Sequence, residues 1–134
     1  MRIIENSMWV FYLDRPDFDN NKVGKWMYFF KDRDFIAKLC QEAVENGVVA
    51  EAKHSNANEG VSCFYLNCDD IDLHKKVIKF FLDNNLIRRT KNGKLYNISF
   101  KKDKQTLAGE YGKDFTSEIK LDQFIDLNTG DWII

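Results

Sequence analysis

Two stretches with the apolar spacing of amphipathic helices divide this chain, and strand-like runs occupy the intervals around them. The first stretch covers 31–47, with a stripe made of Phe35, Ile36, Leu39, Cys40, Ala43 and Val44. The second covers 69–85, with a stripe made of Val77, Ile78, Phe81 and Leu82. Asp32 or Asp34 can cap the first helix and Asp69 or Asp70 the second. The chain therefore contains two helices that each need an apolar surface to cover.

The strand-like runs lie at 7–13, 24–30, 48–55 and 61–67 and are rich in aromatic and β-branched residues. After the second helix, 86–90 and 94–100 flank Lys91-Asn92-Gly93, and Asn-Gly predicts a hairpin. We expect a short helix within 117–127 and a last strand or tail at 131–134. This order predicts an α+β fold, with a mainly antiparallel sheet and two main helices on one face.

Size and composition narrow the class of protein. The 134 residues predict a single domain, 1–134, and 44 % hydrophobic residues support a real core. The 20 Lys+Arg against 21 Asp+Glu lack the basic excess of a general nucleic-acid binder. Because no apolar run reaches the length of a signal peptide or a membrane span, we expect a cytoplasmic protein with no membrane contact.

Metal and cofactor signatures are missing from the sequence. The three cysteines form no CxxC pair and lie at no zinc spacing from the two histidines, which predicts free thiols and no metal site. No phosphate-binding loop, dinucleotide loop, nucleophile elbow or zinc-protease motif is present, and we expect no cofactor.

Other polar side chains have structural explanations. Asp69, Asp70 and Asp72 begin a helix, where the helix dipole favours carboxylates without a metal. His74 lies on the apolar stripe of the same helix, which predicts a half-buried histidine with one hydrogen-bond partner. Lys53 and His54 are adjacent on a strand and therefore point to opposite faces, so one of them is expected to face the core.

Lysines gather at the beginnings and ends of the predicted strands. The basic positions are Lys25, Lys53, Lys101, Lys102 and Lys104, the last three within FKKDKQT at 100–106. Ammonium groups that converge at one rim of a small sheet would attract phosphate or carboxylate. The alternative is ordinary surface lysine, which composition by itself favours. Trp9, Trp26 and Trp132 could stack on a ligand ring, with Trp26 preferred because Gly24 and Lys25 adjoin it. The alternative is that they are core residues, as strand aromatics in small α+β domains usually are, and alternation directs Trp26 and Lys25 to opposite faces.

Three segments in order carry a family resemblance. They are GKWMYFF at 24–30, AEAKHS followed by VSCFYLNCDD within 50–70, and ISFKKDKQTLAGEYG at 98–112. Together they resemble the basophilic-leukaemia-expressed protein family over about 24–112. The family pattern combines G-K-W, A-K-x-S and an aromatic-K-x-D-x-x-T segment that leads to G-x-Y.

The resemblance implies a fold like that of the cap-binding translation initiation factor 4E. In that fold a curved antiparallel sheet carries helices on its convex back and binds a ligand on its concave side. The positions that match the family pattern are Lys25, Trp26, Lys53, Ser55, Lys101, Asp103, Thr106 and Tyr111. The resemblance thus predicts a lysine-lined site for a nucleotide, a phosphorylated small molecule or a phosphorylated peptide.

Two other functions stay open at this point. Bacterial proteins of this kind are also labelled as phosphothreonine lyase domains, which would make Lys53 or Lys101 the base and His54 the acid. The lyases present their acid in K-x-H, with both side chains on one face, whereas Lys53 and His54 are adjacent. The third function is a protein-interaction or inhibitor module that offers a protein partner its N-terminal strand as an edge.

Overall fold

The computed structural model describes residues 1–103 and 119–134 of the chain. Its elements, in chain order, are β1 (Arg2–Glu5), β2 (Trp9–Leu13), β3 (Val23–Phe30), α1 (Arg33–Glu45), β4 (Glu51–Ser55), β5 (Gly60–Asn67), α2 (Ile71–Asp83), β6 (Ser99–Lys102), β7 (Ile119–Lys120) and the 3-10 helix η1 (Leu121–Gln123).

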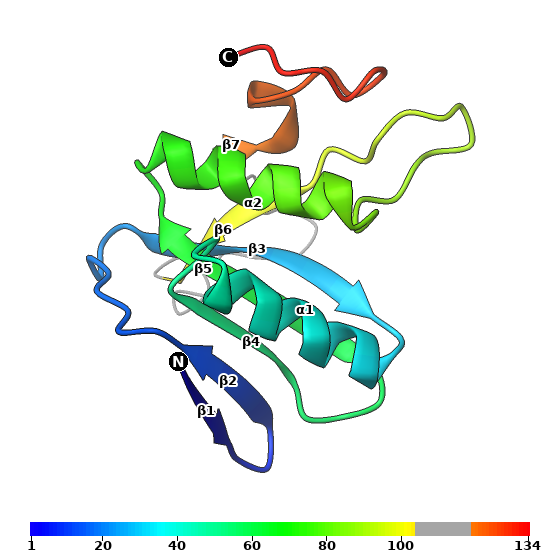
Figure 1. The fold of residues 1–134 in the computed structure, drawn as a ribbon. Coiled ribbons are helices and arrows are strands. Elements are labelled where there is room, and N and C mark those ends of the chain that lie inside the picture. The colour runs from blue at the N-terminus through cyan, green and yellow to red at the C-terminus, as the bar shows by residue number, and fades with distance from the viewer. Residues whose placement is uncertain (104–118) are drawn as a thin grey trace.

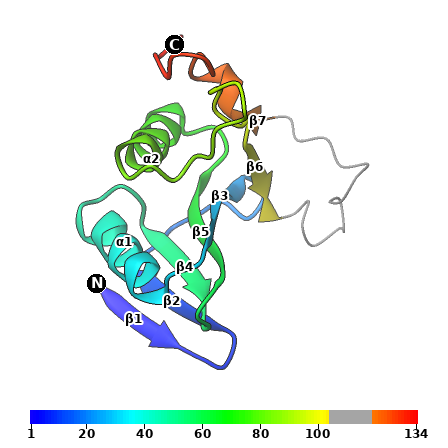
Figure 2. The ribbon, with the colours of Figure 1, turned by 90° about the vertical axis from the view of Figure 1, so that its right-hand side faces the viewer.

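The described strands form one sheet in the order β1-β2-β4-β5-β3-β6-β7, and each adjacent pair is antiparallel. Helices α1 and α2 lie side by side on one face of this sheet (Figures 1 and 2). The predicted α+β class, with a curved antiparallel sheet and two helices, is confirmed. Strand β1 was not predicted, because its residues are all exposed and show no alternation of apolar and polar positions.

Both helices begin where capping chemistry predicts. Asp32 accepts a hydrogen bond from the Phe35 amide at the start of α1, and Asp70 accepts one from Leu73 at the start of α2. Asp69 instead binds Lys22 at 2.7 Å. Asp70 therefore caps the helix as expected, whereas Asp69 forms an ion pair that the sequence did not predict.

The main core lies between the helices and the sheet, with Trp26 fully buried near its centre. Trp26 Nε1 donates to His74 Nδ1 at 3.0 Å, and His74 Nε2 lies 2.8 Å from the carbonyl oxygen of Cys68. The prediction of a half-buried His74 with one partner is wrong, because the ring is fully buried and uses both nitrogens. Burying a ring nitrogen without a hydrogen-bond partner would cost free energy of folding. The contacts of His74 with Trp26 and with the Cys68 carbonyl avoid this cost.

The segment after α2 departs from the predicted hairpin. The turn forms, with Gly93 at φ 83° and its amide donating to the Thr90 carbonyl at 2.9 Å. The two arms share one bridge, between Arg89 and Leu95, with backbone hydrogen bonds from Thr90 to Lys94 and from Tyr96 to Arg88 beside it. After this bridge the second arm separates from the first, because its end forms β6, which pairs with β3 and β7. Tertiary pairing has overridden the local hairpin signal.

At the C-terminal end the structure has shorter elements than the sequence predicted. The expected short helix is the single 3-10 turn η1, and the expected last strand is one bridge between Ile125 and Trp132. The three cysteines are free thiols, as predicted. Within the described ranges, no helix has the length and apolar character needed to cross a membrane.

Candidate functional site

Strand register places Lys25, Lys53 and Lys101 on one face of the sheet. Lys25 lies opposite Tyr65 of β5 and opposite Lys101 of β6. Lys53 lies opposite Cys63, whose i+2 neighbour on β5 is Tyr65. Directly opposite residues share a face, as do residues two apart on a strand. We call this surface the helix-free face, because α1 and α2 cover the other side (Figure 2).

Lys25 is the most enclosed lysine of the helix-free face. Its residue is only 9 % exposed, and its Nζ donates to Asp103 Oδ1 at 2.9 Å. Gly24 makes this approach possible, because a Cβ at that position would lie 2.5 Å from the Lys101 carbonyl oxygen. The Gly-Lys pair therefore lets β6 pack closely against β3 and brings Asp103 within reach of the ammonium group.

Lys53 is held by aromatic rings. Its Nζ lies 3.8 Å from the ring centroid of Trp9, 5.7 Å from that of Phe11 and 5.8 Å from that of Tyr65. An ammonium group over a ring face is attracted by the negative π surface. Among the described residues Lys53 forms no ion pair within 4.0 Å.

Cys63 and Tyr65 form the floor between the lysines and contribute to a small apolar cluster with Val23. Burial raises the pKa of the Cys63 thiol, although Lys53 and Lys25 oppose the shift. Burial also raises the pKa of Tyr65. Both groups are therefore protonated at neutral pH, and a protonated thiol is a poor nucleophile. Cys63 and Tyr65 are 4 % and 6 % exposed, so the floor supports the lysines by packing and offers no reactive group.

One carboxylate at the edge of the site also responds to burial. The pKa of Glu51 is raised mainly by burial and is raised further by Asp103, while Lys53 opposes the shift. Glu51 and Lys53 lie two residues apart on β4, on the same face. The helix-free face thus combines cationic groups with a desolvated acid at its edge.

The structure separates two predicted site residues from the lysines. Trp26 is fully buried on the helix side of β3, so the prediction that it would offer a stacking surface beside Lys25 is wrong. Neighbouring strand residues point to opposite faces, which explains the separation. Trp9 of β2 lies opposite Ser55, which is two residues from Lys53 on β4. Trp9 therefore occupies the helix-free face.

His54 is likewise separated from Lys53. It is 1 % exposed on the core side, where Nε2 lies 3.1 Å from the Tyr12 hydroxyl and Nδ1 lies 2.9 Å from the Ser55 carbonyl oxygen. Burial lowers the pKa of His54. The expectation that one member of the pair faces the core is confirmed, and the pairing of Lys53 as base with His54 as acid is wrong.

Some of the remaining predicted site residues lie on the helix-free face and others do not. Ser55 lies opposite Trp9, but its hydroxyl accepts from the Val61 amide at 3.0 Å and so supports the β4–β5 turn. Lys101 and Asp103 belong to the helix-free face, whereas Thr106 and Tyr111 lie outside the described residues. Sequence reasoning missed Phe11, Cys63 and Tyr65 as site residues. Their strand alternation was visible, but strand order was needed to place them beside Lys53.

In the described part of the chain, no group of three or more His, Cys, Asp or Glu side chains is arranged to hold a metal ion. Comparison of the chain with family models, curated proteins and solved structures finds no match.

Proposed function

We propose that the helix-free face binds a small anionic ligand, either a nucleotide or another phosphorylated molecule. The observation that carries the proposal is the register, which puts lysines from β3, β4 and β6 on one face. Lys53 supplies an ammonium group that forms no ion pair among the described residues, and Trp9 and Phe11 supply ring surface beside it.

The geometry gives the lysines different roles. Asp103 already binds Lys25, so Lys25 holds the β3–β6 junction and contributes to the positive potential. Lys53 contacts the ligand directly, because moving its ammonium from a ring face to a phosphate oxygen gains a charge-assisted hydrogen bond. The vacated face of Trp9 then becomes a stacking surface for a base or another flat group.

The family resemblance and the factor-4E-like fold belong to the same proposal. A cap-binding fold uses the sheet face opposite its helices for its ligand, and the helix-free face is the corresponding surface here. The arrangement favours binding over lyase chemistry, because His54 is enclosed on the other side of the sheet.

A ligand screen tests the proposal. Nucleoside mono-, di- and triphosphates and phosphate esters are added during thermal unfolding. A ligand at 100 times its Kd should add about 2.7 kcal/mol to the unfolding free energy and raise Tm. Lys53→Met keeps an apolar side chain of similar length and should abolish the shift. Lys38→Met, at an exposed position of α1, is the matched control and should preserve it.

Two results would contradict the proposal. One is the lack of any Tm shift with the whole ligand set. The other is equal weakening by Lys53→Met and Lys38→Met, which would place the ligand elsewhere or show a general charge effect.

A further inference from the structure

Among the described residues, half of strand β3 has an open edge. Its residues pair with β5 along the whole strand, from Val23 to Phe30. On the other side, β6 pairs only with Gly24 and Lys25. Among the described residues, no strand covers 27–30 on that side. Alternate residues of an uncovered edge direct backbone N–H and C=O groups outward, which makes it a template for another strand.

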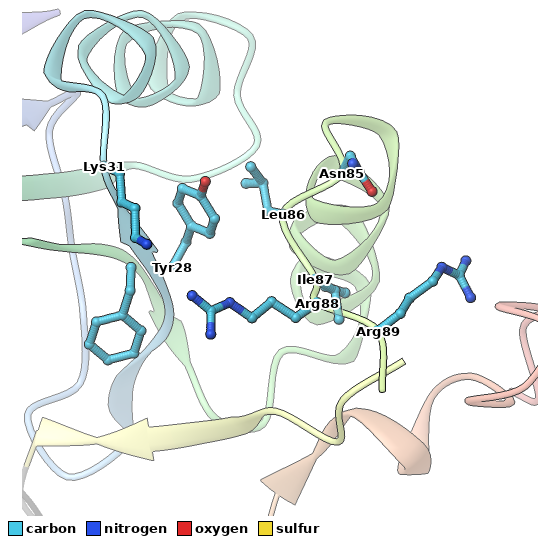
Figure 3. Close-up of a pocket in the computed structure, with 8 residues that line it drawn as sticks. Tyr28, Lys31, Asn85, Leu86, Ile87, Arg88 and Arg89 are labelled. Carbon is cyan, nitrogen blue, oxygen red and sulfur yellow. The ribbon is translucent and has the colours of Figure 1, made fainter. Parts of the chain in front are cut away.

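The segment 85–89 faces this edge across a hollow of about 490 Å³ (Figure 3). Asn85, at φ 56°, turns the chain at the end of α2. Leu86 and Ile87 follow and are 6 % and 5 % exposed, so they anchor the segment in the core. The Arg88 carbonyl accepts from the Tyr96 amide at 2.9 Å. The wall opposite β3 is therefore held in place by burial and hydrogen bonds.

The charged residues that line this hollow, within the described part of the chain, are Lys31, Arg88 and Arg89, with no carboxylate among them. In Figure 3, Lys31 and Arg88 are directed toward the same part of the hollow, while Arg89 is directed away from it. Arg89 donates to the Gly93 carbonyl at 2.8 Å. Among the described residues, neither Lys31 nor Arg88 takes part in an ion pair. Two convergent positive charges favour an anionic partner.

An apolar contact lies next to these charges. Phe29 lines the hollow and is 67 % exposed, and Tyr28 lines it from the adjacent position of β3. A second hollow shares Phe29, Lys31 and Arg88 with the first and is also lined by Glu59 and Gly60, so one carboxylate lies at this second hollow. The surface is thus elongated along the end of β3.

We propose that this surface docks an extended acidic peptide of a partner protein, which adds as a strand to the open edge of β3. The backbone of the peptide forms hydrogen bonds with the backbone of residues 27–30. Its acidic side chains reach Lys31 and Arg88, and an apolar side chain between them covers Phe29. The open backbone edge favours a peptide over a simple anion, because only an extended chain satisfies successive N–H and C=O groups. This inference is independent of the ligand at Lys53.

Fluorescence anisotropy with a labelled hexapeptide of alternating Glu and Val tests the docking site. The matched probes are the same peptide with Lys in place of Glu, and the acidic peptide N-methylated at alternate amides. We expect the acidic peptide to bind and the basic peptide not to bind. N-methylation should weaken binding at least about tenfold, because each methylated amide can no longer donate a backbone hydrogen bond to the edge.

Substitutions locate the site. Arg88→Glu should abolish binding of the acidic peptide, whereas Lys76→Glu makes the same charge change at an exposed position of α2 and should preserve binding. Lys53→Met should have no effect. Circular dichroism checks that each variant is folded.

Four results would overturn the proposal. Two concern the peptides: no binding of the acidic peptide up to millimolar concentration, and undiminished binding of the N-methylated peptide. The third is undiminished binding of the acidic peptide by the Arg88→Glu variant. The fourth is full displacement of the peptide by inorganic phosphate at the same concentration. The last result would reveal a simple anion site.

Discussion

The two faces of the central strands carry opposite kinds of chemistry although their residues alternate along the same backbone. On the helix side, Trp26 and His54 are buried and hydrogen-bonded to other rings. On the helix-free face, their neighbours Lys25 and Lys53 contact a carboxylate and an aromatic ring. The contrast shows that a strand with period-two alternation can serve a core and a charged surface together, and that the helix layer decides which set of residues becomes core.

The largest expected effect on stability comes from a substitution in the core between the sheet and the helices. Trp26→Ala should lower the free energy of unfolding by about 3–5 kcal/mol, because it opens a cavity and removes the donor to His74 Nδ1. Chemical denaturation followed by circular dichroism measures this loss. Lys25→Met, one residue away on the other face, should cost clearly less. Equal losses for the two variants would show that both faces contribute to one core.

The buried histidines predict a dependence of stability on pH. Burial lowers the pKa of both His54 and His74, so the unfolded state binds more protons than the folded state near pH 6. Their stabilising contribution is complete above the ordinary histidine pKa of about 6.5 and is lost as the pH falls toward the folded values. Each histidine can contribute at most about 1.4 kcal/mol per pH unit.

Denaturation between pH 7 and pH 5 tests this prediction. His74→Asn should make the decline shallower, because one of the two titrating groups is gone. An unfolding free energy that stays constant over this range would contradict the burial of neutral histidines.

Close packing of β6 against β3 predicts an intermediate effect. Gly24→Ala should cost about 1–3 kcal/mol, because the new Cβ would meet the backbone carbonyl oxygen of Lys101 and the ring of Phe100. Amide hydrogen exchange should speed up at the β3–β6 junction and stay unchanged in the β4–β5 pair. Uniform exchange rates across the sheet would contradict a local role for Gly24.

The smallest expected effect concerns the ion pair of the helix-free face. A double-mutant cycle with Lys25→Met and Asp103→Asn should give a coupling energy on the order of 1 kcal/mol, because the lysine is enclosed and Asp103 is partly solvated. Raising the salt concentration should reduce the coupling only slightly, since the pair is shielded on one side. A coupling energy of zero would mean that Asp103 does not position Lys25.

Local sequence patterns predicted much of the fold. Helical spacing located α1 and α2 to within two residues, and aspartates at their starts act as caps as expected. The patterns failed where pairing partners far along the chain intervene. The Asn-Gly turn forms, yet its arms separate because β6 gains a partner in β3.

The candidate site was predictable in part. Alternation predicted that Lys53 and His54 point to opposite faces and that Lys25 and Trp26 do so as well, and the structure confirms both separations. Alternation could not place Trp9 beside Lys53, since that contact depends on β2 pairing with β4. The hollow beside Arg88 had no local signal, because it forms between a strand edge and a segment more than fifty residues away in the chain.

The sequence by itself determined the two amphipathic helices, their caps and the alternation that divides each strand into two sets of side chains. These features depend on neighbours within a few residues, and backbone geometry repeats over that distance. Only the tertiary structure decided the strand order, the covered face and which part of β3 lacks a second partner strand among the described residues. Those outcomes depend on which distant segments bury the most apolar surface against one another, and that competition involves the whole chain.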